Sequence, residues 1–424
     1  MTTHARLALP DCRYLLVSSH YAPLYQFGGP VRLAEQYALT ALSAGLMPTV
    51  LTIASQRELR EAVGRSAGSV SATPGTTVVH ALDLDRNSTL ALLRAIPSGL
   101  RATWQHLQGA QRVVLHICEY RAPLTLGAAL ALRAWHMRHP RQSIHILHSA
   151  FGQLQPPTHP AKAFYDYLFR AITHRMRYTV LAQNQHEFDI ARRFFAGHDQ
   201  LRVDLLPLST DGDPACTADT SPAQLRERRV RARAALGLSR DTPVLIFLGR
   251  WVAEKGIERL LRAVAALPSS LQPVLLVAGA DFGIGPRLRE LAESLTIAGR
   301  VRFLENISTQ RFDLYAAADV FTALPIVHEE TMLASVEALS VGTPILVSRE
   351  ADIPYVSDAG AGSVIDFAQP QFEQALLTLL ANHEHASSQA RKTYLQWFAG
   401  GELRRQLLGL LGDDRPAVGP TASR

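Results

Sequence analysis

The sequence has few cysteines, few lysines and no long apolar run. Its three cysteines, Cys12, Cys118 and Cys216, are an odd number at unrelated spacings, so they imply neither a disulfide framework nor a zinc site. No apolar run approaches the roughly 20 residues needed to cross a bilayer, and the longest, residues 123–137, contains Arg133. The N-terminus lacks the basic-then-apolar pattern of a signal peptide. We therefore expect a cytoplasmic protein with reduced thiols.

Lysine occurs only at Lys162, Lys255 and Lys392, so arginine supplies nearly all of the positive charge. Residues 1–210 hold 21 basic and 12 acidic side chains, whereas residues 211–424 hold 22 and 25. The basic half favours anionic partners, either phosphates or the inner face of a membrane. An equally good interpretation is that these arginines solvate helix faces. Nucleic acid is disfavoured as a partner, because no basic stripe carries interleaved aromatic residues.

Short β-branched apolar runs alternate with stretches of helical period along the chain. With 424 residues, 47% of them hydrophobic and 19% charged, the chain is globular and long enough for two or three domains. The alternation predicts an α/β fold whose parallel sheets are covered on both faces. The predicted strands are 13–19, 47–53, 112–117, 143–148, 178–182, 201–206, 243–249, 273–279, 300–305, 319–324 and 343–348.

One interruption of this alternation predicts the domain organisation. Residues 209–224 are rich in Ser, Thr, Asp and Pro and have no apolar period, which is typical of a linker. We expect two Rossmann-like domains, 1–208 and 225–395, and a helix at 396–412 that packs back toward the first domain. The tail, 413–424, is expected to be disordered.

Two loops that follow predicted strands are suited to anions. Gly28 and Gly29 precede a helix that begins near Pro30, and such a helix N-terminus favours negative charge. After the strand that Gly249 ends, Arg250 and Lys255 precede another helix; two cations converging there would suit a diphosphate. The alternatives are an ordinary turn in the first loop and exposed surface cations in the second.

The stretch "HEETMLASVEALSVGTP" places Glu329 just ahead of a short helix and Glu337 inside it. We expect Thr331 to cap this helix, which would run to about Ser340. Both carboxylates could then reach one ligand along the helix N-terminus, and carboxylates are good acceptors for the vicinal hydroxyls of a ribose or a hexose. The alternative is that Glu329 and Glu330 are ordinary helix-start acids.

Four stretches occur in the order found in retaining glycosyltransferases, and the chain resembles glycosyltransferase family 4 (glycosyl transferases group 1). They are "FGGPVRLAEQYALTALSAG", "GRWVAEKGIERLLRAV", "LYAAADVFTALP" and "EETMLASVEALSVGTPILVS". The resemblance implies the GT-B fold, in which two facing Rossmann-like domains hold a nucleotide sugar in the cleft between them. It also implies retaining sugar transfer in polysaccharide or glycoconjugate biosynthesis, from a UDP or GDP sugar to a glycan, lipid-linked or small-molecule acceptor. No metal and no other cofactor is implied.

The resemblance also implies roles for individual residues. Arg250 and Lys255 match the pair that grips the donor diphosphate, Glu329 is expected on the donor sugar and Glu337 on the ribose. His148 matches a histidine that faces the reacting sugar, with His116 as a second candidate. The remaining donor-binding residues are expected to be Gly28, Gly29, Gly249, Thr331, Met332 and Leu333.

Departures from the family pattern keep two other functions open. Where the family usually has Gly-Phe-Gly after the first glutamate, this chain has Glu330, Thr331 and Met332, and Met332 would crowd or reshape the sugar pocket. One alternative is therefore a glycosyltransferase-like protein that binds its ligand without turnover. The other is a nucleotide-sugar epimerase on the same fold, which would need no acceptor.

Overall fold

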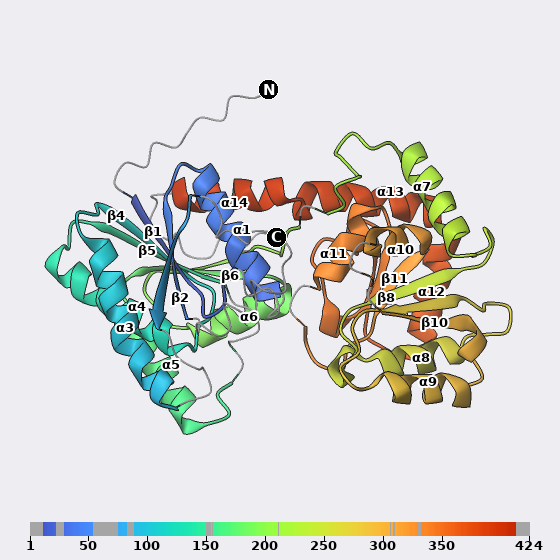
Figure 1. Cartoon of the computed structure of the whole chain (residues 1–424), viewed down its shortest axis with the longest axis horizontal. Coiled ribbons are helices and arrows are strands. Elements are labelled where there is room, and N and C mark those ends of the chain that lie inside the picture. The colour runs from blue at the N-terminus through green and yellow to red at the C-terminus, as the bar shows by residue number, and fades with distance from the viewer. Residues whose placement is uncertain are drawn as a thin grey trace. The chain divides into compact units, whose positions relative to one another are not determined.

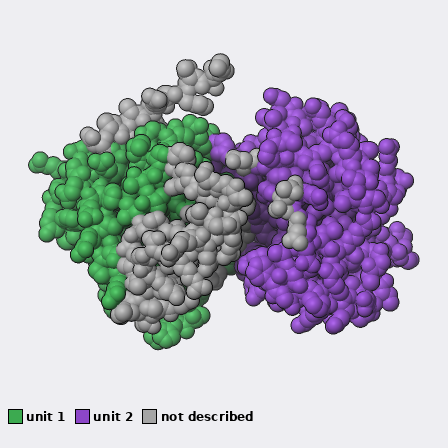
Figure 2. All heavy atoms as spheres, in the orientation of Figure 1, with its two compact units in different colours: residues 1–206, 404–424 green, residues 207–403 purple. Residues whose placement is uncertain are grey.

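The chain divides into two compact units, each built around one parallel sheet. The computed structural model describes residues 12–22, 29–53, 75–82, 89–149, 154, 156–210, 212–305, 307, 310–329 and 332–412. Unit 1 comprises residues 1–206 and 404–424, and unit 2 comprises residues 207–403 (Figure 2). Residues 209–224 thus group with unit 2, and the first boundary lies two residues before the expected one.

Unit 1 contains a seven-stranded sheet in the order β3-β2-β1-β4-β5-β6-β7 (Figure 1). The strands are β1 Cys12–Val17, β2 Pro48–Ile53, β3 Thr77–Leu82, β4 Arg112–Ile117, β5 Ser143–Ser149, β6 Arg177–Ala182 and β7 Leu201–Leu205. All the strand pairs in it are parallel. β2 and β3 are added in turn on one side of β1, and β4 then pairs with β1 on its other side. The strand order therefore reverses between β1 and β4.

The helices of unit 1 cover this sheet, and α3 and α4 run side by side (Figure 1). Those described are α1 Gly29–Ser43, α3 Thr89–Leu107, α4 Pro123–Arg138, α5 Pro160–Thr173 and α6 Gln185–Phe194, and α14 Gly400–Gly412 belongs to unit 1 from residue 404 on. Within unit 1 the Arg112 guanidinium donates to the backbone oxygen of Leu411 in α14, and Arg404 donates to the backbone oxygen of Ser43 at 3.2 Å. Among the described residues, no helix is both long and apolar enough to cross a membrane.

Unit 2 contains a six-stranded sheet in the order β10-β9-β8-β11-β12-β13, again with parallel pairs. The strands are β8 Val244–Leu248, β9 Val274–Ala278, β10 Val301–Leu304, β11 Val320–Ala323, β12 Ile345–Ser348 and β13 Gly362–Ile365. Residues 244–247 are fully buried, as expected for a central strand covered on both faces. In this sheet the order reverses between β8 and β11.

Helices lie on both faces of this sheet, with α8 and α9 together on one side and α10 and α11 on the other (Figure 1). The helices are α7 Pro222–Ala235, α8 Ile257–Ala265, α9 Gly285–Ser294, α10 Arg311–Ala317, α11 Leu333–Ser340, α12 Gln369–Ala381 and α13 His383–Thr393. A π-helical turn, Tyr394–Phe398, follows α13.

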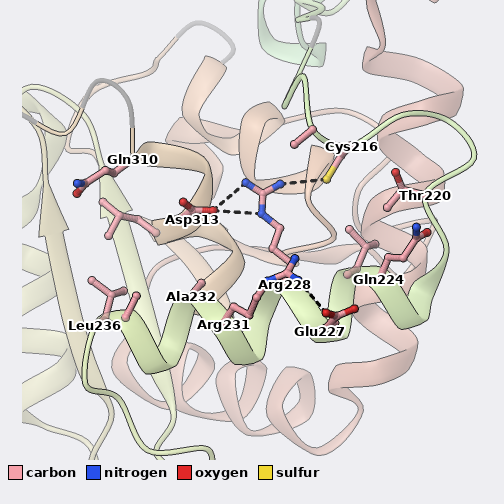
Figure 3. A pocket seen from close by; sticks show the side chains of 14 residues that line it. Cys216, Thr220, Gln224, Glu227, Arg228, Arg231, Ala232, Leu236, Gln310 and Asp313 are labelled. Carbon is pink, nitrogen blue, oxygen red and sulfur yellow. Dashed lines mark hydrogen bonds and ion pairs between the residues drawn. The ribbon is translucent and has the colours of Figure 1, made fainter.

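Helix α7 attaches the expected linker segment to unit 2. Arg228 of α7 bonds to Asp213 of that segment and to Asp313 of α10, the latter at 2.9 Å. It also reaches the Cys216 sulfur at 3.2 Å, on one wall of a cavity of about 870 Å³ (Figure 3). None of the predicted site residues that the structure describes lines this cavity. Its lining comes mainly from α7, α10 and the segment before α7.

The predicted α/β class and the eleven predicted strands are confirmed, but two edge strands were missed. These are β3 and β13. β13 gave no strand signal because it is short and begins with a glycine, a residue that is unfavourable in strands. The predicted helix cap also needs a correction. Helix α11 begins at Leu333 with Met332 at its N-cap, and no side-chain cap is present there; Thr331 itself lies outside the described residues.

Candidate active site

The candidate site lies where the strand order of unit 2 reverses. In open parallel sheets, ligands bind outside the carboxyl ends of the strands at such a switch point. The loop after β8 carries Lys255, the loop after β11 carries Glu329, and the Lys255 ammonium donates to a Glu329 carboxylate oxygen. A cation and an anion that are 74 positions apart in the chain are thus paired at the predicted place.

A glycine brings these two loops together. Gly256 has φ 66°, in the left-handed region, and a Cβ placed on it would lie 1.9 Å from the backbone oxygen of Leu324. Only glycine tolerates both conditions without strain. Nearby, the Ile326 amide donates to the backbone oxygen of Glu254 at 3.0 Å. The loop after β8 is therefore fixed against the loop after β11, and Lys255 is held next to Glu329.

The Lys255–Glu329 pair is mostly shielded from water, with side chains 16% and 14% exposed. Charges this far from water interact strongly, and removal of one partner leaves the other without compensation. The Glu329 amide also donates to the backbone oxygen of Glu350 at 2.6 Å, in the segment that follows β12. Three strand ends therefore support one charged pair.

Arg250, the other predicted cation, has different surroundings. It is exposed, and its guanidinium carbon lies 5.6 Å from the centre of the Phe282 ring. It makes no ion pair within the described part of the chain. Gly249, which precedes it, is half-buried beside the ring of Phe247. The structure thus places both cations on the loop after β8, but of the two only Lys255 forms an ion pair with a described residue.

Glu337 is buried within α11, and both of its carboxylate oxygens are engaged. Arg311 donates to Oε1 at 3.2 Å, and the Tyr315 hydroxyl donates to Oε2 at 3.2 Å. Burial and the nearby carboxylate raise the pKa of Tyr315 well above its usual value, so this hydroxyl remains a donor. Arg311 and Tyr315 lie four residues apart on α10, the spacing of one helix face. That spacing could have identified them in the sequence, but they were not predicted.

The remaining predicted donor-binding residues are only partly described. Met332 is buried and Leu333 is half-buried at the start of α11, next to Glu329 in sequence. Gly29 is the first residue of α1 in unit 1. Gly28 and Thr331 lie outside the described residues. Of the predicted set, the structure therefore brings together Lys255 and Glu329.

The two predicted histidines are buried in unit 1. His148 lies in β5, its Nδ1 is 2.9 Å from the Tyr178 hydroxyl, and its ring stacks on Tyr120. Burial lowers the pKa of His148 to about 3, and that of His116 to about 3. Both imidazoles are therefore neutral near pH 7. Nε2 of His148 has no hydrogen-bond partner among the described residues.

Comparisons with solved structures establish the GT-B fold. A glycosyltransferase from Rickettsia africae superposes with a TM-score of 0.66 at 14% identity, over 94% of this chain and 97% of that one. Anabaena HepE, solved in complex with UDP-glucose, superposes with a TM-score of 0.61 at 15% identity, over 94% and 99%. At these identities the likeness shows the fold alone.

Sequence comparisons confirm the predicted resemblance in the second half of the chain. Residues 229–396, all within unit 2, match the family model of glycosyl transferases group 1. The D-inositol 3-phosphate glycosyltransferase of Corynebacterium jeikeium is 33% identical over 210 residues, which cover 44% of this chain and 49% of that protein. The chain thus spans about half the length of this curated relative. The matched region contains Arg250, Lys255, Glu329 and Glu337.

Proposed function

We propose that this protein is a glycosyltransferase that moves a sugar from a nucleotide-diphosphate sugar to a hydroxyl of a glycan, lipid-linked or small-molecule acceptor. The observation that carries the proposal is the shielded Lys255–Glu329 pair at the switch point of unit 2. It lies inside the region that matches glycosyl transferases group 1. We place the reaction in polysaccharide or glycoconjugate biosynthesis.

Lys255 and Arg250 are proposed to bind the donor diphosphate. Lys255 is already held by Glu329, so a cation is in place before the donor arrives. Arg250 is exposed at the end of the same loop and can turn toward a phosphate. An arriving diphosphate would share the Lys255 ammonium with Glu329, leaving carboxylate lone pairs to accept sugar hydroxyls. Glu337 is proposed to accept from the ribose, supported by Arg311 and Tyr315.

The proposed chemistry is retaining. The acceptor oxygen forms a bond to the anomeric carbon on the face from which the diphosphate leaves, and the bond between that carbon and the phosphate oxygen breaks. The acceptor proton passes to the departing phosphate oxygen. Negative charge grows on the leaving group, and fixed cations placed there stabilise the transition state most. Because Lys255 and Arg250 supply this positive charge, we propose that no metal is required.

For His148 we propose a hydrogen-bonding role rather than a charged one. Its pKa of about 3 leaves it uncharged near pH 7, and the Tyr178 hydroxyl fixes its ring. An imidazole in this state can orient a neighbouring group through Nε2 but is a poor base. His116 is enclosed by the Tyr14 hydroxyl at 2.5 Å and the Ser149 hydroxyl at 3.0 Å, which supports a structural role for it.

The proposed donor and acceptor are tested together by product analysis. The enzyme would be incubated with UDP-glucose, UDP-N-acetylglucosamine or GDP-mannose and with D-inositol 3-phosphate, in the presence of a chelator. We expect a coupled product that keeps the anomeric configuration of the donor, formed at least about a hundredfold more slowly by Lys255→Ala. A free or altered sugar without coupling would favour the epimerase. Binding without turnover of any of these substrates would favour the non-catalytic protein.

Peripheral membrane contact is proposed through helix α5. Phe164 and Tyr167, which are 66% and 67% exposed, lie on one face with the exposed Arg170, and Lys162 is exposed in the first turn of the helix. Its only acid, Asp166, is buried. Aromatic residues beside cations suit the interface of an anionic bilayer. Sedimentation with phosphatidylglycerol vesicles should be salt-sensitive and should fall in Phe164→Ser/Tyr167→Ser; equal sedimentation of both proteins would contradict this contact.

A further inference from the structure

The switch point of unit 1 holds a second acid–base pair. His20 follows β1, and Glu119 follows β4, the two neighbouring strands between which the strand order reverses. His20 Nδ1 and Glu119 Oε1 are 2.9 Å apart. The pair thus has the position in unit 1 that Lys255 and Glu329 have in unit 2, at the edge of an open parallel sheet where ligands bind.

Four of the residues around this pair are buried. Ser18 and Tyr21 on one side, and Cys118 and Tyr120 on the other, are 1% exposed or less. The side chains of His20 and Glu119 are 27% and 18% exposed. The structure therefore presents a polar pair to solvent in surroundings that exclude most water, where hydrogen bonds to a ligand are stronger than at an open surface.

The backbone of both residues is held by buried hydroxyls. The Ser18 hydroxyl donates to the backbone oxygen of His20 at 2.7 Å, and the Thr125 hydroxyl donates to the backbone oxygen of Glu119 at 2.7 Å. Ser18 and Thr125 are fully buried. In addition, the Cys118 amide donates to the backbone oxygen of Val17 at 2.9 Å, which extends the pairing of β1 with β4. The backbone that carries the two side chains is thus fixed before any ligand binds, as in a preorganised site.

We infer that His20 and Glu119 form a binding subsite for the acceptor, and that its ligand is a sugar or polyol with adjacent hydroxyls. This rests on the proposed function. A carboxylate accepts hydroxyl hydrogens through two oxygens, and an imidazole can donate or accept through its nitrogens. Glu119 is unfavourable for a phosphate at this point, so the subsite takes the neutral hydroxyl-bearing part of the acceptor. The pair's proposed role is to hold the acceptor, whose proton still passes to the leaving phosphate.

The test is saturation-transfer NMR on the full chain, with and without UDP. The probes are glucose, galactose, mannose, N-acetylglucosamine and D-inositol 3-phosphate. We expect the wild type to bind at least one of them, and Glu119→Gln and His20→Asn to bind it about tenfold more weakly or worse. UDP affinity and melting temperature should stay at wild-type values, which excludes a folding defect.

A matched control is available in the same unit. His174 and Asp199 form another histidine–carboxylate pair, 3.6 Å apart and about half exposed. They precede β6 and β7 and so lie near the amino ends of those strands, not at the carboxyl ends of β1 and β4. His174→Asn should leave probe binding unchanged. Equal binding by all variants, or no probe binding by the wild type, would overturn the inference. Because the probes are also titrated without nucleotide, a wild type that binds a probe but neither UDP nor GDP would contradict the proposed function and leave the subsite standing.

Discussion

The two sheets reverse their strand order at equivalent points, and the two points carry different pairs of side chains. In unit 2 the pair is Lys255 with Glu329, across the ends of β8 and β11. In unit 1 it is His20 with Glu119, across the ends of β1 and β4. A lysine ammonium suits a diphosphate, whereas imidazole and carboxylate suit hydroxyls. The topology therefore indicates where a ligand binds, and the side chains indicate which chemistry it has.

The two points also differ in how their loops are held. In unit 2 the backbones approach so closely at Gly256 that no side chain fits. In unit 1 the loops are held by the Ser18 and Thr125 hydroxyls, which bond to backbone oxygens. The comparison predicts that the unit 2 site is destroyed by adding atoms to the backbone, whereas the unit 1 site is altered by changing side chains.

The largest effect is expected for Lys255→Ala. It removes the partly shielded cation and leaves the Glu329 carboxylate without its partner, so kcat/KM for the sugar nucleotide should fall by about 10²- to 10³-fold. Steady-state kinetics with a series of donor concentrations would measure this. Lys392→Ala removes an exposed lysine of the same unit and serves as the control. A Lys255→Ala enzyme with wild-type kcat/KM would show that the pair does not act on the donor.

The next effect is structural and comes from Gly256→Ala. Its Cβ would overlap the Leu324 oxygen and strain a left-handed residue, so the free energy of unfolding should fall by about 3 kcal/mol or more. Gly237→Ala is the matched control, since Gly237 has φ 60° with nothing within 4 Å of its added Cβ. It should lose only about 1 kcal/mol. If urea unfolding showed equal losses of unfolding free energy in the two variants, the close approach of Gly256 to the Leu324 oxygen would contribute nothing to the cost of the substitution.

Acid should destabilise unit 1 through its buried histidines. The folded pKa of His148 is about 3, well below the usual 6.5, so the unfolded chain binds the proton more tightly. Unfolding free energy should therefore fall as pH drops from about 6.5 toward 3, by up to about 1.4 kcal/mol per pH unit for this residue. Urea unfolding at several pH values should give a shallower slope for His148→Asn. An unchanged slope would refute the neutral buried imidazole.

The smallest effect on stability is expected for Arg250→Ala. The side chain is exposed and lies over an exposed Phe282 ring, so the free energy of unfolding should change by less than about 0.5 kcal/mol. Its effect on donor binding should be clear but smaller than that of Lys255→Ala. Urea unfolding and UDP titration of the same variant separate the two quantities. Loss of stability without loss of affinity would assign Arg250 to the fold instead.

The sequence predicted the strands that have a clear local pattern. It could not predict contacts, such as that between His20 and Glu119, that depend on the order of the strands in the sheet. The apolar run at 244–248 predicts a strand by itself, whereas edge strand β13, with four residues and a leading glycine, gives no such signal. Lys255 and Glu329 were found because they stand in stretches that resemble a known family. His20 and Glu119 are 99 positions apart, and only the order of the strands shows that they meet. The helix cap was misplaced because Met332, which has no capping oxygen, starts α11.

The most direct test of the central claim is calorimetric titration of UDP, and then GDP, into the wild type, Arg250→Ala/Lys255→Ala and Lys392→Ala. The account predicts micromolar binding of one nucleotide by the wild type and by Lys392→Ala, with binding lost in the double variant. Equal affinity of the double variant, measured on folded protein, would contradict the claim that the switch point of unit 2 binds the nucleotide diphosphate.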